Sequence, residues 1–147
     1  MLFRSGYGET IASSVAVDAA GNVYVKGTFT ANITIGTSNL VAVGSTKNVF
    51  LAKFNTVGGL TWVQQPQGDT GNQGGSGVAV DQAGSIYITG LFDTMALNFG
   101  TISLTNVGAS YDAFVAKYNS SGAIQWARQT GGTNFDEIGR ASCRERV

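Results

Sequence analysis

The sequence predicts an all-β chain made of two consecutive, antiparallel four-stranded units. Three observations predict it. One stretch of sequence recurs, four turns of the form Asx-x-x-Gly stand at matched places, and the chain is rich in glycine and poor in charge. Of its 147 residues, 21 are glycine and 12% are charged. This composition is typical of many short strands joined by tight turns.

The first observation is an internal repeat. The run Val-Ala-Val-Asp-Ala-Ala-Gly-Asn-Val-Tyr-Val-Lys-Gly at residues 15–27 has a twin, Val-Ala-Val-Asp-Gln-Ala-Gly-Ser-Ile-Tyr-Ile-Thr-Gly, at residues 78–90. The two runs are 63 residues apart, and Trp62 and Trp126 further along are 64 apart, so the second copy has one inserted residue. A fixed period of this size is the signature of a repeat architecture.

The turns divide each copy into hairpins. An Asx side chain can accept hydrogen bonds from backbone N–H groups two or three residues on, and glycine can adopt the left-handed conformation that closes the turn. The four turns begin at Asp18, Asn55, Asp81 and Asn119. We therefore expect two main hairpins per unit: strands 14–18 with 22–29 and 49–54 with 60–65, then 77–81 with 85–92 and 113–118 with 124–129. Weaker strand signals over 30–46 and 93–110 predict a small, outlying hairpin in each unit.

The main strands are apolar on both faces. In residues 49–54 and 113–118, odd and even positions alike are largely hydrophobic. A sheet with one solvated face would alternate, so these sheets are expected to be covered on both sides. Two-sided, antiparallel, four-stranded units repeated in tandem describe the blades of a β-propeller. A parallel solenoid is the alternative, but its coils are usually about 20 to 30 residues long and need no pair of hairpins.

These units divide the chain. Residues 1–13 fit the end of a preceding blade or a connector, residues 14–76 the first blade and residues 77–137 the second. Propellers close with about 4 to 8 blades. We therefore expect a fragment of a larger ring, whose partners are neighbouring blades of a parent chain. The isolated chain is then expected to be marginally stable or to associate, because the outer faces of its blades expose apolar surface.

The last ten residues break the repeat. Residues 138–147, Ile-Gly-Arg-Ala-Ser-Cys-Arg-Glu-Arg-Val, resemble the translation of a common short-read sequencing adapter, so we expect a non-native tail. The tail holds three of the nine basic residues, one of the nine acidic ones and the only cysteine. The remainder has a net charge of −2 and no basic patch, which argues against a nucleic-acid partner. No window approaches 18 apolar residues, so no membrane insertion is expected.

A family resemblance follows from the repeat. The pattern Val-Ala-Val-Asp-x-x-Gly-Asn-Val-Tyr-Val-x-Gly, with Asp-Ala-Phe-Val-Ala-Lys-Tyr at 112–118 and a Gly-x-x-x-Trp strand, resembles the bacterial seven-bladed β-propeller repeats called SBBP repeats. The resemblance covers residues 5–137, and the first copy departs from it at residues 47–49 and 66–67. It implies a large, exported or surface-exposed bacterial protein without an assigned activity. We expect a non-enzymatic scaffold, or a surface for protein or glycan, located outside the cell or in its envelope; residues near Met1 do not resemble a signal peptide.

The residues that attract a functional interpretation also have structural ones. Asp18 and Asp81 could be repeated calcium ligands, but the several oxygen donors of an Asp-x-Asp-x-Asp loop are missing, which favours turn capping. The loop 68–75 has glycines and oxygen donors without the Lys-Ser/Thr of a phosphate loop, which favours a flexible inter-blade connection. Lys53 and Lys117 alternate with aromatic residues, which favours edge-guarding or snorkelling over catalysis.

The tryptophans open a second hypothesis. The Gly-x-x-x-Trp pattern at Trp62 and Trp126 is also similar to the quinoprotein-type propeller repeat, where tryptophans mostly lock blades together. The chain could then belong to a propeller enzyme, quinoprotein-like or glycan-active, whose site lies on missing blades. Up to residue 137 there is no histidine and no cysteine, and Asp69 and Asp136 lie in loops that nothing pairs. The sequence therefore predicts no catalytic residue, no cofactor and no metal ligand in this segment.

Overall fold

The computed structural model describes residues 3–5, 8–44 and 46–132. Within these ranges the chain consists of strands, turns and bends, with no helix that could cross a membrane. The strands are β1 (Phe3–Ser5), β2 (Thr10–Val17), β3 (Val23–Phe29), β4 (Ile33–Ile35), β5 (Ser38–Leu40), β6 (Asn48–Phe54), β7 (Leu60–Gln64), β8 (Gln67–Gly68), β9 (Gln73–Val80), β10 (Ile86–Phe92), β11 (Ala96–Phe99), β12 (Ile102–Thr105), β13 (Asp112–Tyr118) and β14 (Ile124–Thr130).

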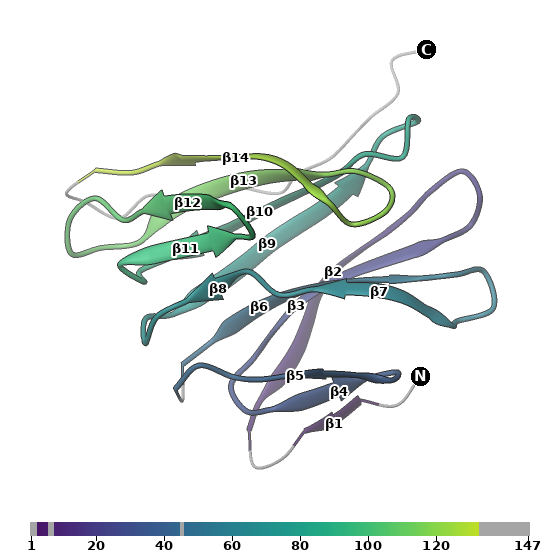
Figure 1. Cartoon of the computed structure of the whole chain (residues 1–147), viewed down its shortest axis with the longest axis horizontal. Coiled ribbons are helices and arrows are strands. Elements are labelled where there is room, and N and C mark those ends of the chain that lie inside the picture. The colour runs from purple at the N-terminus through teal and green to yellow at the C-terminus, as the bar shows by residue number, and fades with distance from the viewer. Residues whose placement is uncertain (1–2, 6–7, 45, 133–147) are drawn as a thin grey trace.

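Two four-stranded antiparallel sheets form the body of the molecule (Figure 1). The first main sheet has the order β2-β3-β6-β7 and the second has the order β9-β10-β13-β14. The two orders are equivalent, because each sheet is built from two consecutive hairpins. The predicted fold class is therefore confirmed: the chain is all-β, with two propeller-like blades. The division of the chain after residues 13 and 76 stays a prediction.

The four predicted Asx turns are present. Gly21, Gly58, Gly84 and Gly122 have φ values of 83°, 81°, 78° and 85°, the left-handed conformation that glycine adopts without a steric penalty. In each turn the glycine N–H donates a 3.0 Å hydrogen bond to the carbonyl oxygen of the Asx residue. The matched turns explain why the two main sheets have the same topology.

Two smaller sheets accompany the main ones. The first small sheet has the order β1-β4-β5, and the second has the order β8-β11-β12. The sequence predicted only the hairpins β4-β5 and β11-β12, so β1 and β8 are additions that come from the segment preceding each main sheet. Neither small hairpin is outlying, which corrects the expectation from the sequence. Ile33, Ile35 and Leu40 of β4-β5 are buried in the core that includes the first main sheet. Leu97, Phe99 and Leu104 of β11-β12 are buried in the core that includes the second main sheet.

The first strand of each main sheet is longer than predicted. β2 begins at Thr10 instead of residue 14, and β9 begins at Gln73 instead of residue 77. Both extensions pass through a β-bulge, where the register with the next strand shifts. The extra residue of a bulge breaks the alternation of apolar positions, and this hides the strand from a pattern of period two. Half of the loop predicted over 68–75, namely Gly68 and residues 73–75, is therefore paired strand, which corrects the expectation of a flexible connection for these residues.

The core has two parts. The first lies between the first main sheet and the first small sheet, and includes Phe29, Ile35, Phe50 and Phe54. The second joins the two units: Tyr24 and Leu51 of the first main sheet pack with residues of the second main sheet and the second small sheet, among them Ile86, Ile88, Phe92, Phe99 and Phe114. Burying a side chain of this size contributes about 1.5–3 kcal/mol, so the joint core holds the two units together.

Candidate binding site between the two units

The two units are joined by a set of contacts at the outer end of their shared core. Trp62 on β7 lies against Gly122 in the β13–β14 turn, where a Cβ would come within 2.8 Å of the indole ring. The indole Nε1 donates a 3.2 Å hydrogen bond to the carbonyl oxygen of Ser120, and Lys53 Nζ donates to the same oxygen at 3.1 Å. The predicted role of Trp62 in blade packing is thereby confirmed.

The matching aromatic and lysine residues of the second unit have the same geometry as those of the first. The Tyr24–Trp62 ring centroids are 6.2 Å apart and the Tyr87–Trp126 centroids 6.3 Å apart. Lys53 Nζ lies 5.4 Å from the centroid of the Tyr24 ring, and Lys117 Nζ lies 5.4 Å from that of Tyr87. The lysines therefore lie over aromatic rings, a favourable arrangement for a cation, and Lys53 also links the units.

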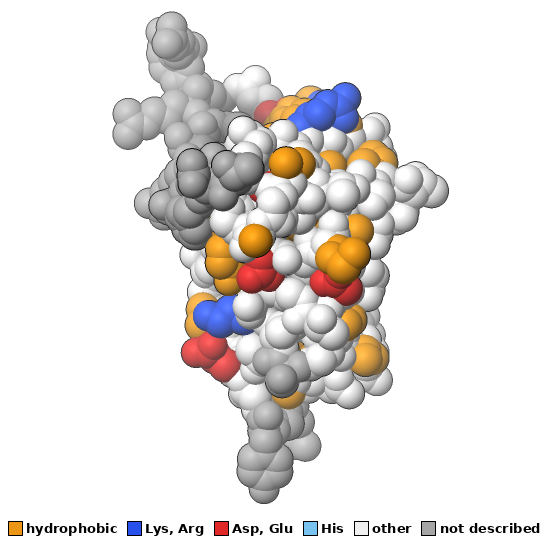
Figure 2. Space-filling view, turned by 90° about the vertical axis from the view of Figure 1, so that its left-hand side faces the viewer, with side chains coloured by type: hydrophobic (Ala, Val, Ile, Leu, Met, Phe, Trp, Pro, Cys, Tyr) orange, Lys and Arg blue, Asp and Glu red, His pale blue; other side chains and the backbone are white. Residues whose placement is uncertain are grey.

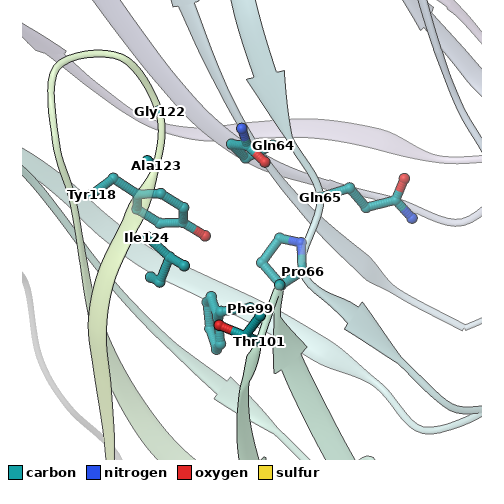
Figure 3. A pocket seen from close by; sticks show the side chains of 10 residues that line it. Gln64, Gln65, Pro66, Phe99, Thr101, Tyr118, Gly122, Ala123 and Ile124 are labelled. Atoms are coloured by element: carbon teal, nitrogen blue, oxygen red, sulfur yellow. The ribbon is translucent and has the colours of Figure 1, made fainter.

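A cavity of about 310 Å³ lies beside the Trp62 contact (Figure 3). Three segments line it: the connector from β7 to β8, the β11–β12 turn and the β13–β14 hairpin. Its lining residues are Gln64, Gln65, Pro66, Phe99, Gly100, Thr101, Tyr118, Gly122, Ala123 and Ile124. None of them carries a formal charge. The cavity therefore combines an apolar wall with a few amide and hydroxyl groups.

Tyr118 is the most buried polar side chain of this cavity. The residue is 3% exposed, and its ring packs on Phe99 with centroids 6.5 Å apart. Its hydroxyl points toward Pro66 in Figure 3 and forms no hydrogen bond with a residue that the structure describes. Burial raises the pKa of Tyr118 well above its usual value, so the phenol stays protonated. It can both donate and accept a hydrogen bond.

The corresponding place in the first unit is built differently. Phe54 stands where the second unit has Tyr118, so the hydroxyl is missing there. A Cβ on Gly36 would lie 2.9 Å from Leu60 Cβ, whereas a Cβ on Gly100 would lie 3.8 Å from Ile124 Cγ2. The turn of the first unit is therefore packed more closely by its neighbouring strand than the turn that borders the cavity.

The two aspartates considered as calcium ligands act as turn caps. Asp18 Oδ1 accepts from the N–H groups of Ala20 and Asn22, and Oδ2 accepts from Asn22 Nδ2 at 2.9 Å and from the Tyr24 hydroxyl at 2.9 Å. Partial loss of water would raise the pKa of Asp18, but these hydrogen bonds outweigh it and lower the pKa. Donors of the protein itself already satisfy both carboxylate oxygens.

Asp81 repeats this arrangement in the second unit. Its Oδ1 accepts from the N–H of Ser85 at 2.8 Å and its Oδ2 from the Tyr87 hydroxyl at 3.1 Å. The turns that begin at Asp18 and Asp81 together line a second cavity of about 210 Å³. The described residues bring no three His, Cys, Asp or Glu side chains together as a metal site. Capping, the favoured interpretation of both aspartates, is confirmed.

The remaining carboxylate candidate that the structure describes is Asp69. Asp69 caps its own loop, with Oδ1 accepting from Gly71 N at 3.1 Å and Oδ2 from Met95 N at 3.0 Å. Asp136, its suggested partner, lies outside the described residues. Figure 2 shows a face of the molecule whose surface is mostly neutral, with few charged side chains. This agrees with a net charge near zero and a charged content of 12%.

Lys26 is a functional-looking residue that sequence reasoning missed. Its side chain is fully buried between the units, and Nζ has no hydrogen-bond partner among the described residues. The space that Nζ occupies exists because Gly75 has no Cβ; an added one would lie 2.0 Å away. Burial lowers the pKa of Lys26 to about 7. The repeat offered one signal, since Thr89 stands at the matching position of the second unit.

The cavity residues Gln64, Phe99 and Tyr118 were also missed. Phe99 and Tyr118 pack together within the second unit, and the packing of the two units adds Gln64 from β7. The available signal was the difference between the copies, tyrosine at position 118 against phenylalanine at position 54. A polar substitution within an otherwise apolar strand pair marks a place where the two copies do not have the same surroundings.

Comparison with known proteins agrees with the repeat geometry. No family model matches the chain. An uncharacterized WD repeat-containing protein of Acanthamoeba polyphaga mimivirus is 28% identical in an alignment of length 125 that covers 78% of this chain and 9% of that protein. The chain thus spans only a small part of that relative's length. WD repeats form four-stranded propeller blades, so this distant similarity and the structure agree on a chain of two antiparallel, propeller-like blades.

Proposed function

We propose that this chain is a non-enzymatic segment of a larger β-propeller, acting as a scaffold and as a surface that binds protein or glycan. The proposal is supported by the way one unit covers the next. The face of the first main sheet that carries Tyr24, Leu51 and Trp62 is covered by the second unit. The second main sheet carries the matching Tyr87, Val115 and Trp126 in the same positions of its own outer face.

One contrast between twin residues carries the proposal. Val78 on β9 is 5% exposed because the first unit packs against it, whereas its twin Val15 on β2 is 63% exposed. Val17, the next residue on the same face of β2, is 58% exposed. Apolar side chains this exposed, on the same face of an edge strand of the first main sheet, favour a preceding unit of the same kind as their natural cover.

The setting belongs to the same proposal. The resemblance to SBBP repeats supports an exported or surface-exposed bacterial parent, in which the blades display loops to the outside. WD repeat-containing proteins give a parallel precedent for propellers as interaction surfaces. The neighbouring blades of the parent chain are the first partners, and a protein or glycan ligand is the second.

The parent reading frame tests this proposal. We expect it to encode about 4 to 8 such units with an export signal upstream of them, and we expect the ring to be recovered from the secreted or envelope fraction. A parent with only two units, or one retained in the cytosol, would contradict the scaffold and its setting. A cluster of histidines or calcium ligands at one rim of the ring would instead favour the alternative, a quinoprotein-like or glycan-active propeller enzyme.

A further inference from the structure

We propose that the cavity beside Trp62 binds a neutral sugar ring, as one residue of a glycan. This inference deepens the proposed binding role and rests on it. All ten lining residues belong to the two units of this chain, so the site does not depend on further blades for its walls. Nothing in the repeat itself requires the cavity, because the first unit has a more closely packed turn at the matching position.

The polar groups of the cavity are open to a ligand. The hydroxyl of Tyr118 forms no hydrogen bond with a described residue, and its oxygen stays accessible from the cavity although the residue as a whole is only 3% exposed. The amide of Gln64 likewise forms no hydrogen bond with the described residues, although Gln65 Nε2 donates to the carbonyl oxygen of Val41 at 2.8 Å. Water can occupy these open groups, and a ligand that offers hydroxyl groups can replace it there.

The types of these groups indicate the ligand class. Gln64 offers a carbonyl acceptor and an NH₂ donor, while the hydroxyls of Tyr118 and Thr101 can each donate or accept. Hydroxyl groups of a sugar match such mixed donors and acceptors. Phe99, Pro66 and Ile124 supply an apolar wall for the C–H face of the same ring. Aromatic and aliphatic walls with a few orienting polar groups are typical of small-ligand sites.

Charge and size narrow the choice. No lining residue is charged, so an acidic or amino sugar would lose its hydration without gaining an opposite charge. A cavity of about 310 Å³ lies at the small end of ligand sites, which span roughly 300–1,000 Å³. It accommodates one ring with adjoining substituents. An extended peptide would need a longer groove, and Gln65, which borders the cavity, is already bound to Val41.

Saturation-transfer difference NMR on the full chain tests this proposal, because it detects weak ligands and tolerates self-association. The probes are the methyl glycosides of glucose, galactose, mannose and N-acetylglucosamine, with glucuronic acid as the charged comparison. We expect at least one neutral glycoside to receive saturation and glucuronic acid to receive none. An excess of the free sugar that corresponds to a bound methyl glycoside is expected to compete with it and abolish its signal.

Two substitutions locate the binding. Y118F gives the second unit the phenylalanine that the first unit has at position 54, so the fold is expected to tolerate it, and Q64M removes the amide at similar size. Each is expected to weaken glycoside binding about three- to tenfold, as the loss of one hydrogen bond does. Y87F is the matched control, since it removes a tyrosine hydroxyl that is bonded to Asp81, away from the cavity.

The outcomes separate cleanly. Weakening by Y118F and Q64M with unchanged binding in Y87F supports the site. Absence of saturation for every neutral glycoside, equal affinity in Y118F, or preference for glucuronic acid overturns it. A parent frame with many units and an export signal would then leave the scaffold proposal standing, while failure of the parent frame would not by itself alter the NMR result.

Discussion

The indole of Trp62 and the carbonyl of Ser120 form a hydrogen bond between the two repeat units, with 3.2 Å from Nε1 to the oxygen. The bond joins a strand of the first main sheet to a turn of the second. Ser120 O also accepts from Lys53 Nζ, so a single backbone carbonyl receives two donors from the neighbouring unit. Trp62 and Trp126 thus have the same geometry within their own units, and Trp62 in addition bonds to the neighbouring unit.

Trp62 and Trp126 are therefore expected to differ in their contribution to stability. W62A removes the contact between the units and the hydrogen bond to Ser120, and we expect it to lower the free energy of unfolding by about 3 kcal/mol. W126A removes packing on Tyr87 within one unit and is expected to cost less than about 1.5 kcal/mol. Urea unfolding followed by circular dichroism measures both, and equal losses would contradict the role of Trp62 between the units.

Gly27 and Gly90 should not tolerate a methyl group. A Cβ on Gly27 would lie 2.2 Å from the Ile11 carbonyl oxygen and 2.7 Å from the Phe50 ring, and Gly90 repeats this geometry with Gly74 and Phe114. We expect G27A and G90A each to cost about 2–3 kcal/mol through forced backbone shifts. G74A is the control, because its nearest contact would be Leu91 Cβ at 3.8 Å. Thermal unfolding of the three variants compares them, and a stable G90A would show the bulge to be looser than described.

Lys26 should make stability depend on pH. The folded state lowers its pKa from 10.5 to about 7 through burial. Between these values the unfolded chain binds a proton that the folded chain does not, so stability rises with pH by about 1.4 kcal/mol per unit. The penalty is fully present below about pH 7 and is absent above the unfolded pKa.

K26M removes this proton and isolates its effect. Nζ lies 6.0 Å from the centroid of the Phe114 ring, and burial lowers the pKa of Lys26 with no contribution from an acidic group. We expect K26M to be more stable than the unsubstituted chain at neutral pH. Urea unfolding between pH 7.5 and 9, a range chosen from the Lys26 pKa values, should give K26M a free energy of unfolding that does not change with pH. Measurement below pH 10, the usual tyrosine value, avoids the raised pKa of Tyr24, which lowers stability only at higher pH. Parallel profiles for the two proteins would refute this account of Lys26.

Val15 and Val78 offer a test of the missing neighbour. V78T places a hydroxyl in the core between the units and is expected to cost about 1–2 kcal/mol. V15T changes a residue that is 63% exposed, so its effect on stability should stay within about 0.5 kcal/mol. Sedimentation velocity should show less self-association for the double variant V15T/V17T than for the unsubstituted 147-residue chain. If the unsubstituted chain is monomeric at every concentration, the exposed apolar face of β2 does not drive association, which would contradict this account.

Local sequence was sufficient for the hairpins. The four turns depend on an Asx acceptor and a glycine within a few residues, and such short-range chemistry is visible in the sequence. The strands β1 and β8 were not predictable, because each pairs with a segment about 30 residues away and is only a few residues long. The extended starts of β2 and β9 were also missed, because the extra residue of each bulge interrupts the alternation by which a strand is recognised in a sequence.

The candidate site was less accessible to sequence reasoning than the fold. Tyr118 ends a strand whose counterpart in the first unit has a similar apolar pattern and ends in phenylalanine, and Gln64 lies at the end of a strand with no distinctive pattern. Their proximity results from the packing of one unit on another, a tertiary effect that no local propensity contains. Lys26 illustrates the same limit, since a lysine in a strand gives no sign that the glycine opposite it will leave room for a buried ammonium group.

The central claim is that the two repeats pack face to face as neighbouring blades. The most direct measurement is a nuclear Overhauser effect between the Trp62 indole and the α-protons of Gly122, which lie in different units. We expect a strong cross-peak, because the ring is within 2.8 Å of the position of a Gly122 Cβ. Its absence, in a spectrum that shows the Tyr24–Trp62 contact within the first unit, would mean that the units fold without packing in this way.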